Sequence, residues 1–257
     1  MNVYLLKSLV GAFLFCLLSS AIYLLNDIVD QSSDRMHPEK RFRPIASGEI
    51  SVAAAKWAAS VLALVSLSAS WFIEERFFLV VMLYAANNLL YFYFFKKKTV
   101  LDVLSIAIGF VLRVYGGGVI IGVEITKWLV ACVFSLSVFL GFGKRRSEYQ
   151  DLQAGAMQIR KVHESYSIEK LDMLLGTSAA LAIVTYLLYS LAPETKALHD
   201  TDRIIFTTPF VVYCIFRYML KVQEGKSGDT VELMLRDRGF LVAGILWIIT
   251  LMSLLQF

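Results

Sequence analysis

The sequence predicts an all-α integral membrane protein, built as a bundle of eight transmembrane helices. Hydrophobic residues make up 58% of the 257 residues and charged residues only 18%, whereas about a quarter of a typical soluble domain is charged. The apolar residues gather in runs of about 20, the length that a helix needs to cross a bilayer. The composition therefore excludes an ordinary soluble enzyme, a disordered chain and a disulfide scaffold.

Each apolar run is expected to form one helix, because only helices and closed barrels satisfy their backbone hydrogen bonds in lipid. Barrel strands would be shorter and would alternate apolar with polar residues, which these runs do not. No Gly/Ser-rich or Pro-rich linker separates the runs, so we expect a single domain over 1–257. The eight spans are predicted at 8–26, 51–72, 77–95, 100–121, 126–143, 172–192, 204–221 and 239–257.

Basic residues alternate strictly between the two sides of the predicted bundle. The connections at 27–50, 96–99, 144–171 and 221–238 hold 17 Lys and Arg residues, and the remaining connections with the N-terminal segment hold 5. Loops rich in Lys and Arg stay in the cytoplasm, so these four connections are predicted to be cytoplasmic. The protein is expected in the cell membrane, which it crosses several times.

The first span poses a topological problem. With this charge pattern both termini lie outside, yet only six residues precede Lys7 and none of them directs translocation. A cleaved signal peptide is disfavoured, because the apolar run continues into a polar motif without a convincing cleavage site. A further helix upstream of Met1 explains the topology better.

The polar residues that follow the first span predict a metal site. Asn26, Asp30 and Asp34 recur every four residues, so on a helix they form one stripe with a spacing of about 6 Å. Stacked acidic groups repel one another unless a cation lies among them. Hard oxygen ligands, without a Cys or a second His nearby, suit Mg²⁺ with its water and phosphate oxygens. We therefore predict that Mg²⁺ is bound by Asn26, Asp27, Asp30 and Asp34.

Basic residues follow this acidic stripe (Asn26, Asp30 and Asp34, with Asp27 beside them) almost at once. Lys40, Arg41 and Arg43 suit anionic phosphate oxygens. The alternative is a solvated acidic helix end followed by a basic loop at the membrane surface. Ionisable groups that begin inside the membrane boundary are costly and usually functional. The pattern therefore favours a site for a metal ion and a diphosphate.

The segments NDIVDQSSD (26–34) and HPEKRFRPIASG (37–48) resemble the first aspartate-rich motif of the UbiA superfamily of membrane prenyltransferases. The resemblance implies a nine-helix fold around a central cavity, of which this chain lacks the first helix. A second polar motif lies four helices later in that superfamily, and here the connection 144–171 falls at that place. The catalytic residues that the resemblance implies are Asp30, Asp34, Lys40 and Arg43, the last two also as substrate-binding residues.

Five further segments resemble one branch of this superfamily, the decaprenyl-phosphate phosphoribosyltransferases. They are YFYFFKKKTVLDV (91–103), GFVLRVYGGG (109–118), GKRRSEYQD (143–151), RKVHESYS (160–167) and LRDRGF (235–240). The resemblance implies two substrates, phosphoribosyl diphosphate and a polyprenyl phosphate. The further substrate-binding residues that it implies are Tyr91, Lys96, Arg113, Lys144, Arg145, Glu148, Arg160 and Tyr166.

Two other functions stay open. The first is a prenyltransferase that joins an isoprenyl diphosphate to a small aromatic acceptor. Such members carry a second DxxxD motif, where this chain has only Glu148 and Asp151. The second is a transporter or lipid-binding bundle, which would place its charges along a midplane path. Nucleic acid is not expected as a partner, because the basic residues flank membrane spans, and the sequence leaves a homo-oligomer open.

The reaction expected from the resemblance moves 5-phosphoribose from phosphoribosyl diphosphate to the lipid phosphate. Departure of diphosphate from the anomeric carbon builds negative charge, which Mg²⁺ and fixed cations neutralise. The lipid phosphate is already an anion and needs positioning more than a strong base. Arg113 lies at mid-span, where an unpaired cation costs at least ~2.5 kcal/mol, so we expect a partner or ligand beside it. For His37, which has no second His at ligand spacing, a loop-shaping role is favoured.

Overall fold

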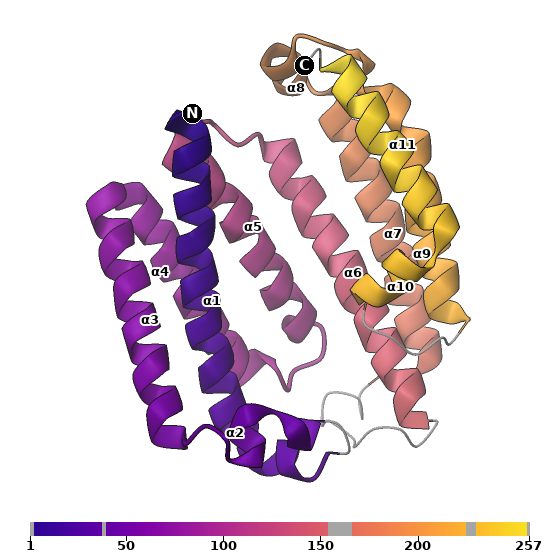
Figure 1. Cartoon of the computed structure of the whole chain (residues 1–257). Coiled ribbons are helices and arrows are strands. Elements are labelled where there is room, and N and C mark those ends of the chain that lie inside the picture. Colours follow the sequence, from indigo (N-terminus) through magenta and orange to yellow (C-terminus); the bar gives the residue numbers. More distant parts are fainter. Residues whose placement is uncertain (1–2, 38–39, 154–165, 225–229, 256–257) are drawn as a thin grey trace. The chain divides into compact units, whose positions relative to one another are not determined.

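The computed structural model describes residues 3–37, 40–153, 166–224 and 230–255, and within these ranges all regular structure is helical (Figure 1). This confirms the predicted all-α class. In chain order the elements are α1 (Val3–Arg35), η1 (Lys40–Phe42), α2 (Pro44–Ser47), α3 (Val52–Ile73), α4 (Glu75–Leu90), η2 (Tyr91–Phe95), α5 (Leu101–Ile121), α6 (Lys127–Gln153), α7 (Ile168–Leu191), α8 (Pro193–His199), η4 (Arg203–Thr207), α9 (Thr208–Gln223), α10 (Thr230–Arg236) and α11 (Arg238–Leu254).

The apolar runs all form helices. Within the described ranges, seven helical segments are long and apolar enough to cross a membrane, and α11, with 17 residues, is a shorter apolar helix. Each of these eight segments overlaps one predicted span. The last of them, α11, is one residue shorter than the 18 residues taken here as the minimum for a membrane span. Their outer faces carry large apolar side chains, such as Phe72 at 86% and Trp57 at 74% exposed. Such faces suit lipid, and the protein is a multi-pass membrane protein.

The chain divides into two compact units, which are described separately. Unit 1 comprises Met1–Lys98 and Ile108–Ile125, and unit 2 comprises Thr99–Ala107 and Thr126–Phe257. The first turns of α5 belong to unit 2 and the rest of that helix to unit 1. The single domain over 1–257 stays a prediction.

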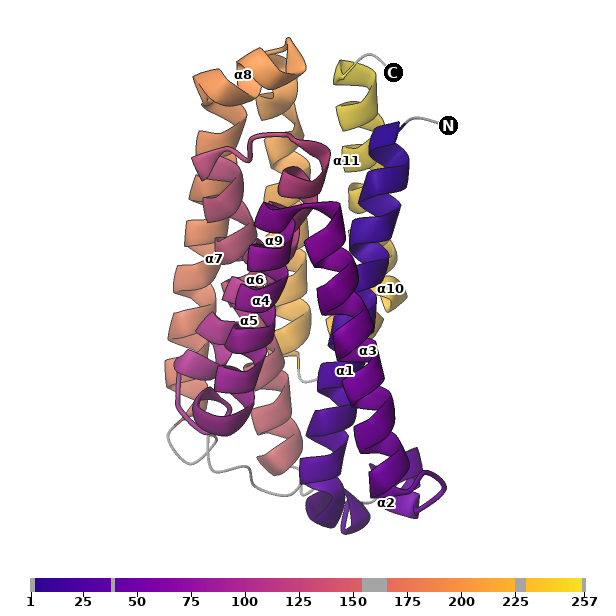
Figure 2. The same ribbon diagram turned by 90° about the vertical axis from the view of Figure 1, so that its left-hand side faces the viewer.

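In unit 1, α1, α3 and α4 run alongside one another, and the α3–α4 connection lies at the end opposite α2 (Figures 1 and 2). The core is aromatic at its centre, because the Phe15 ring makes edge-to-face contacts with Phe77 at 5.6 Å and with Tyr84 at 5.4 Å. Gly116 is needed beside this cluster, since a Cβ there would lie 2.7 Å from the Phe15 ring. The buried Ser66 hydroxyl donates to Leu14 O at 2.8 Å.

In unit 2, α6 and α7 form an extensive pair, α9 packs on both, and α11 lies along α9 (Figure 1). The core is built on Val103, Phe139, Leu175, Ala179 and Tyr218, among others. Phe139 and Tyr218 contact each other edge to face at 5.3 Å. Because lipid tails are as apolar as these side chains, close packing rather than removal from water holds the helices together here.

Two helices are longer than the apolar runs predicted. α1 continues to Arg35, past the predicted end at residue 26, and α6 continues to Gln153, so the first ten residues of the predicted loop 144–171 are helical. In both helices the extension carries charged residues that are paired with partners in the same unit, as described below. Ion pairing thus allows helix to continue where hydropathy alone predicts a loop.

Candidate active site

The acidic stripe lies on the last turns of α1, as its period of four predicted. All four residues are helical, and Asp34 is only 5% exposed, while Asn26, Asp27 and Asp30 are half-buried. Two basic side chains divide the stripe between them. One comes from the segment that follows α1, and the other comes from the end of α4.

Arg43 holds two of the carboxylates together. Its Nη1 donates to Asp27 Oδ1 and to Asp34 Oδ2, at 2.9 Å in each case. The spacing of Asp27 and Asp34, seven residues or about two turns, places both on one face of α1. Because Asp34 is buried, this ion pair compensates a carboxylate that burial would otherwise penalise. Asp27 and Asp34 therefore share one cation, Arg43.

The backbone around Arg43 is fixed to α1. Pro44 occupies the first turn of α2, where its locked φ is preorganised for a helix. The Gln31 side chain donates to Ile45 O, and the Arg35 Nε donates to Ala46 O, both at 3.0 Å. The chain then turns away at Gly48, which has a φ of 90° that favours glycine. The segment that follows α1 is thus folded back on that helix, with Arg43 directed at the stripe.

Lys96 holds the other half of the stripe. Its Nζ lies 2.5 Å from Asp30 Oδ2 and 3.1 Å from Asn26 Oδ1. Lys96 follows η2, a π-helical turn over Tyr91–Phe95, and its N–H donates to Tyr91 O at 2.8 Å. One-turn π-helices widen a helix by one residue and occur often at functional sites. Here the wider turn precedes the lysine that reaches across to α1.

The oxygens of the stripe are of the chemical type that a magnesium diphosphate requires. Each pair already converges on one positive centre, and the set holds only carboxylate and amide oxygens, which Mg²⁺ prefers together with phosphate oxygens and water. Because Arg43 and Lys96 divide the stripe into two pairs, the described residues offer no group of three or more His, Cys, Asp or Glu side chains arranged to hold a metal. Ligation of Mg²⁺ by Asn26, Asp27, Asp30 and Asp34 stays a prediction.

The other predicted residues of this part of unit 1 lie near the ends of the same helices. Lys40 begins η1, and its backbone N–H donates to His37 Nδ1 at 3.3 Å, in line with a loop-shaping role for His37. Tyr91 begins η2 and is half-buried. A substrate role for Lys40 and for Tyr91 stays a prediction.

Arg113 occupies the middle of α5 and is held by aromatic and hydroxyl groups. Its guanidinium lies 5.0 Å from the Tyr84 ring centre and 5.2 Å from that of Phe110. Its Nη2 also donates to the Tyr84 hydroxyl and, at 3.5 Å, to Ser19 Oγ. Among the described residues no carboxylate pairs with Arg113. The partners that the sequence led us to expect beside it are therefore aromatic rings and hydroxyl groups. Cation–π contacts of this kind contribute about 2 kcal/mol or more when desolvated.

Arg145 and Glu148, both expected to bind substrate, form a polar cluster inside unit 2. Arg145 is 4% exposed and its Nε lies 2.7 Å from Oδ2 of Asp102, which is 1% exposed. On its other side Arg145 pairs with Glu148, one turn later on α6. Since removing one member of a buried ion pair leaves an uncompensated charge, this cluster has a strong structural role. Substrate binding by Arg145 and Glu148 stays a prediction.

Tyr166 joins the same cluster from the residues before α7. Its hydroxyl accepts from the backbone N–H of Val100 at 2.9 Å, and the side chain is buried. Burial raises the pKa of the Tyr166 hydroxyl above its usual 10, while the hydrogen bond from Val100 opposes that rise. The phenol is therefore neutral at physiological pH and acts as a fixed hydrogen-bonding group. Val100 itself has a φ of 69°, a strained conformation for a β-branched residue.

The substrate roles of Lys144 and Arg160 stay predictions. Lys144 is exposed on α6, and Arg160 lies outside the described residues. Among the ion pairs that the sequence did not predict, two involve residues outside the predicted site. The buried Arg146 pairs through Nε with Asp172 Oδ1 at 2.9 Å, and Arg217 forms a two-pronged pair with Asp237. The segment LRDRGF does contain Asp237, but its partner lies on a different helix.

The Asp237 pair has a measurable electrostatic consequence. The Asp237 carboxylate caps α11 by accepting from Phe240 N at 2.8 Å, and Arg217 Nη2 donates to it at 2.8 Å. The hydrogen bond from Arg217 lowers the pKa of Asp237 from its usual 3.8 to about 2. Asp237 therefore stays ionised over the physiological range and fixes the start of α11 to α9.

Comparison with known proteins shows which sequences this chain resembles. Three relatives named decaprenyl-phosphate phosphoribosyltransferase align over most of the chain. The relative from Mycolicibacterium smegmatis is 33% identical, over 98% of this chain and 81% of the relative. That from Corynebacterium glutamicum is 33% identical over 91% and 71%, and that from Mycobacterium tuberculosis is 31% identical over 95% and 80%, respectively.

The fold also matches solved structures. A UbiA homolog from Archaeoglobus fulgidus bound to DMAPP and Mg²⁺ superposes with a TM-score of 0.72 at 20% identity, over 99% of this chain and 88% of that one. The same homolog bound to GPP and Mg²⁺ gives a TM-score of 0.73 at 20% identity, over 100% and 89%. The sequence model of the UbiA prenyltransferase family matches residues 2–244. This chain is a transferase enzyme that belongs to the UbiA prenyltransferase family.

Proposed function

We propose that this enzyme transfers 5-phosphoribose from phosphoribosyl diphosphate to a polyprenyl phosphate, with Mg²⁺, at the cytoplasmic face of the cell membrane. The observation that carries the proposal is the acidic stripe of α1 with its two fixed cations, Arg43 and Lys96. Relatives that align over more than nine tenths of the chain are named for this reaction, which supports the choice of donor and acceptor.

The stripe and its cations suit the diphosphate of the donor. Asn26, Asp27, Asp30 and Asp34 would hold Mg²⁺, which when bound supplies positive charge against the diphosphate oxygens. Arg43 and Lys96 carry their own charge, and each is held in place by two oxygens of the stripe. Both cations would lie beside the bound diphosphate, within reach of its oxygens. A positive centre that is already positioned needs little reorganisation as the charge develops.

The reaction exchanges one bond at the anomeric carbon. An oxygen of the lipid phosphate forms a bond to C1 of the ribose, and the bond from C1 to the diphosphate oxygen breaks. The electron pair leaves with the diphosphate, so the charge that develops there is the one Arg43 and Lys96 are placed to stabilise. No proton has to leave the attacking phosphate, because it is already an anion. Correct placement of two mutually repelling anions is thus the main task of the protein.

The membrane position suits an amphiphilic acceptor. The stripe lies at the end of a long apolar helix, α1, and the following segment carries Lys40, Arg41 and Arg43. Excess Lys and Arg mark this side as cytoplasmic. A polyprenyl phosphate would keep its chain in the bilayer and its phosphate at the level of the stripe.

The test uses membranes that contain the protein, phosphoribosyl diphosphate labelled in the ribose, and a polyprenyl phosphate. We expect label in the lipid fraction with Mg²⁺ and none after chelation with EDTA. Control membranes contain the Asp30→Asn variant, which is nearly isosteric and loses one charge of the stripe. If no label reaches lipid, while an isoprenyl diphosphate is joined to an aromatic acid such as 4-hydroxybenzoate, the prenyltransferase alternative is correct.

A further inference from the structure

A groove of about 290 Å³ opens in unit 1 between α1, α3, α4 and η2. The side chains that line it include Ile22, Leu25, Val29, Lys56, Leu89 and Phe92. The aliphatic and aromatic members lie within helices that are long and apolar enough to span the membrane. Neither the ion pairs of the stripe nor the predicted diphosphate contacts use this groove.

The groove adjoins the acidic stripe at a single lysine. Lys96 Nζ, which contacts Asp30 at 2.5 Å, lies 5.6 Å from the ring centre of Phe92 in the groove wall. Val29, another wall residue, directly precedes Asp30 on α1. An apolar chain against Phe92 and Val29 therefore carries a group at its end within reach of the stripe.

A second lysine gives the groove a positive charge. Lys56 lies in the first turns of α3, and among the described residues it makes no ion pair or hydrogen bond. No carboxylate lines the groove. An unpaired ammonium beside an apolar wall suits an amphiphile with an anionic head. Because Lys56 is exposed, an anionic head group can reach it and form an ion pair, which a neutral or cationic head group cannot.

We propose that this groove holds the first isoprene units of the polyprenyl phosphate acceptor, with the lipid phosphate between Lys56 and Lys96. The inference rests on the proposed function and adds the place where the acceptor binds. The chain lies outside the stripe, which remains available to the diphosphate of the donor. Donor and acceptor thus approach Lys96 from different sides, and the lysine screens the repulsion between their phosphates.

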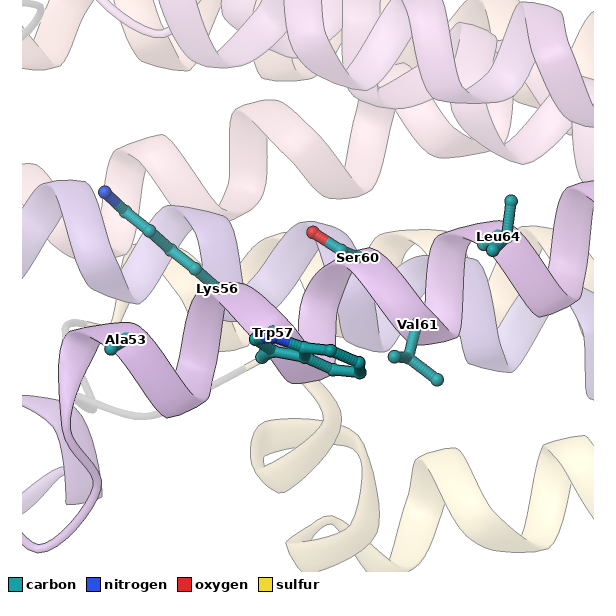
Figure 3. A pocket seen from close by; sticks show the side chains of 6 residues that line it. All are labelled: Ala53, Lys56, Trp57, Ser60, Val61 and Leu64. Carbon is teal, nitrogen blue, oxygen red and sulfur yellow. The ribbon is translucent and has the colours of Figure 1, made fainter.

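The outer face of α3 offers a matched control. A second shallow groove there, of about 390 Å³, is lined by Ala53, Lys56, Trp57, Ser60, Val61 and Leu64, all from α3 itself (Figure 3). In Figure 3 the Lys56 side chain extends away from the indole of Trp57. Leu64 is apolar and 69% exposed, and it lies about 12 Å beyond Lys56 along α3. A bulky residue at Leu64 meets lipid and leaves the proposed acceptor groove unchanged.

The kinetic test narrows the groove with Leu25→Trp and Leu89→Trp, and uses Leu64→Trp as the control. We expect the KM for a ten-isoprene polyprenyl phosphate to rise by about tenfold or more in the two groove variants, which corresponds to about 1.4 kcal/mol. The KM for phosphoribosyl diphosphate should stay within twofold of wild type, as should both constants of Leu64→Trp. Equal KM values for the lipid in all four proteins would overturn the inference.

A second test reads binding without catalysis. The wild-type protein in phosphatidylcholine nanodiscs is labelled with a polyprenyl phosphate that carries a benzophenone on its first isoprene units. We expect label in the peptides that contain residues 22–29 and 89–93, and we expect competition by unlabelled polyprenyl phosphate but not by phosphatidylglycerol. Equal competition by phosphatidylglycerol would instead indicate an ordinary site for anionic phospholipid, and label confined to the face of Leu64 would place the acceptor elsewhere.

These outcomes separate the inference from the proposed function. If wild-type protein transfers phosphoribose to lipid but the groove variants leave the lipid KM unchanged, the function stands and the groove assignment is wrong. If no phosphoribose reaches any lipid, the proposed function is wrong. The labelling experiment then still shows what the groove binds.

Discussion

Lys96 Nζ lies 2.5 Å from Asp30 Oδ2, and this ion pair joins residues 66 positions apart in the chain. It connects the end of the α4–η2 segment to the acidic stripe of α1. The same ammonium also contacts Asn26. One side chain thus sets the spacing of two helices in unit 1 and supplies a cation at the place where we propose that a diphosphate leaves.

Lys96→Ala should reduce phosphoribosyl transfer by about 100-fold, because loss of one preorganised charge at a developing anion typically costs a factor of 10²–10³. The neighbouring Lys97→Ala is the control, since Lys97 is exposed and, among the described residues, makes no ion pair. It should retain activity within twofold. Initial rates at saturating lipid measure both. Similar losses in the two variants would mean that only the overall basic charge of this connection matters.

Arg43→Gln should destabilise the protein, because it leaves the buried Asp34 without its ion-pair partner. Breaking a charged hydrogen bond of this kind costs about 1.5–3 kcal/mol, and the half-exposed position of Arg43 favours the lower end. The thermal unfolding midpoint in detergent should fall. Arg41→Gln, next but one in the chain, should change it little, because Arg41 lies over the Phe42 ring at 4.7 Å and outside the stripe. An unchanged midpoint in Arg43→Gln would show that the pair contributes nothing to stability.

The sequence predicted the stripe but not its partners. A period of four placed Asn26, Asp30 and Asp34 on one helical face whatever the rest of the chain does. Which cation meets which carboxylate depends on how distant segments fold back, and several basic residues of the same loops were equally plausible. Asp27 is an example. It shares the cation Arg43 with Asp34 only because the segment after α1 folds back over that helix, and no local sequence pattern encodes this.

The Asp102–Arg145 pair in unit 2 allows a charge-removal test. Asp102→Leu alone leaves the buried Arg145 with less compensation, and removal of one partner from a buried ion pair costs about 3–5 kcal/mol. The double variant Asp102→Leu/Arg145→Met should recover part of that loss, since it removes the Asp102–Arg145 pair but also takes Arg145 away from Glu148. Thermal unfolding midpoints of the two single variants and the double variant give the coupling. Strict additivity would contradict the pairing.

Activity of the same double variant tests whether Arg145 also binds a substrate phosphate. If Arg145 binds a substrate phosphate, stability returns in Asp102→Leu/Arg145→Met but transfer activity does not. If Arg145 serves only the fold, stability and activity return together. Because Glu148 also contacts Arg145, activity is compared with the stability that this double variant actually recovers and not with that of wild type.

Acid should weaken the attachment of α11 through Asp237. The pKa of Asp237 is lowered from its usual 3.8 to about 2, mainly by the hydrogen bond from Arg217. The Asp237 carboxylate thus binds a proton less tightly in the folded than in the unfolded state. Its ionisation therefore stabilises the fold fully above about pH 4, and this stabilisation is lost as the pH falls toward 2. The difference in unfolding midpoint between wild type and Asp237→Asn should therefore be constant from pH 7 to 5 and shrink below pH 4. A difference that does not depend on pH would exclude this ionisation as its cause.

Hydropathy and charge counts predicted the helical spans well, because lipid leaves the backbone few other choices. They failed at the helix ends. α6 continues through Arg145 and Arg146 to Gln153, since both arginines find carboxylates, Asp102 and Asp172, elsewhere in unit 2. A basic residue after an apolar run is therefore an ambiguous signal. It marks a cytoplasmic loop when solvated and a buried ion pair when an acid from another helix lies beside it.

Whether the acidic stripe and its cations hold a magnesium diphosphate can be measured by calorimetric titration of the purified protein. Phosphoribosyl diphosphate is titrated with and without Mg²⁺ into wild type and Asp30→Asn. We expect binding to wild type that requires Mg²⁺ and is weakened at least tenfold in Asp30→Asn. Equal affinity with EDTA in place of Mg²⁺, or an unchanged affinity in Asp30→Asn, would contradict this expectation.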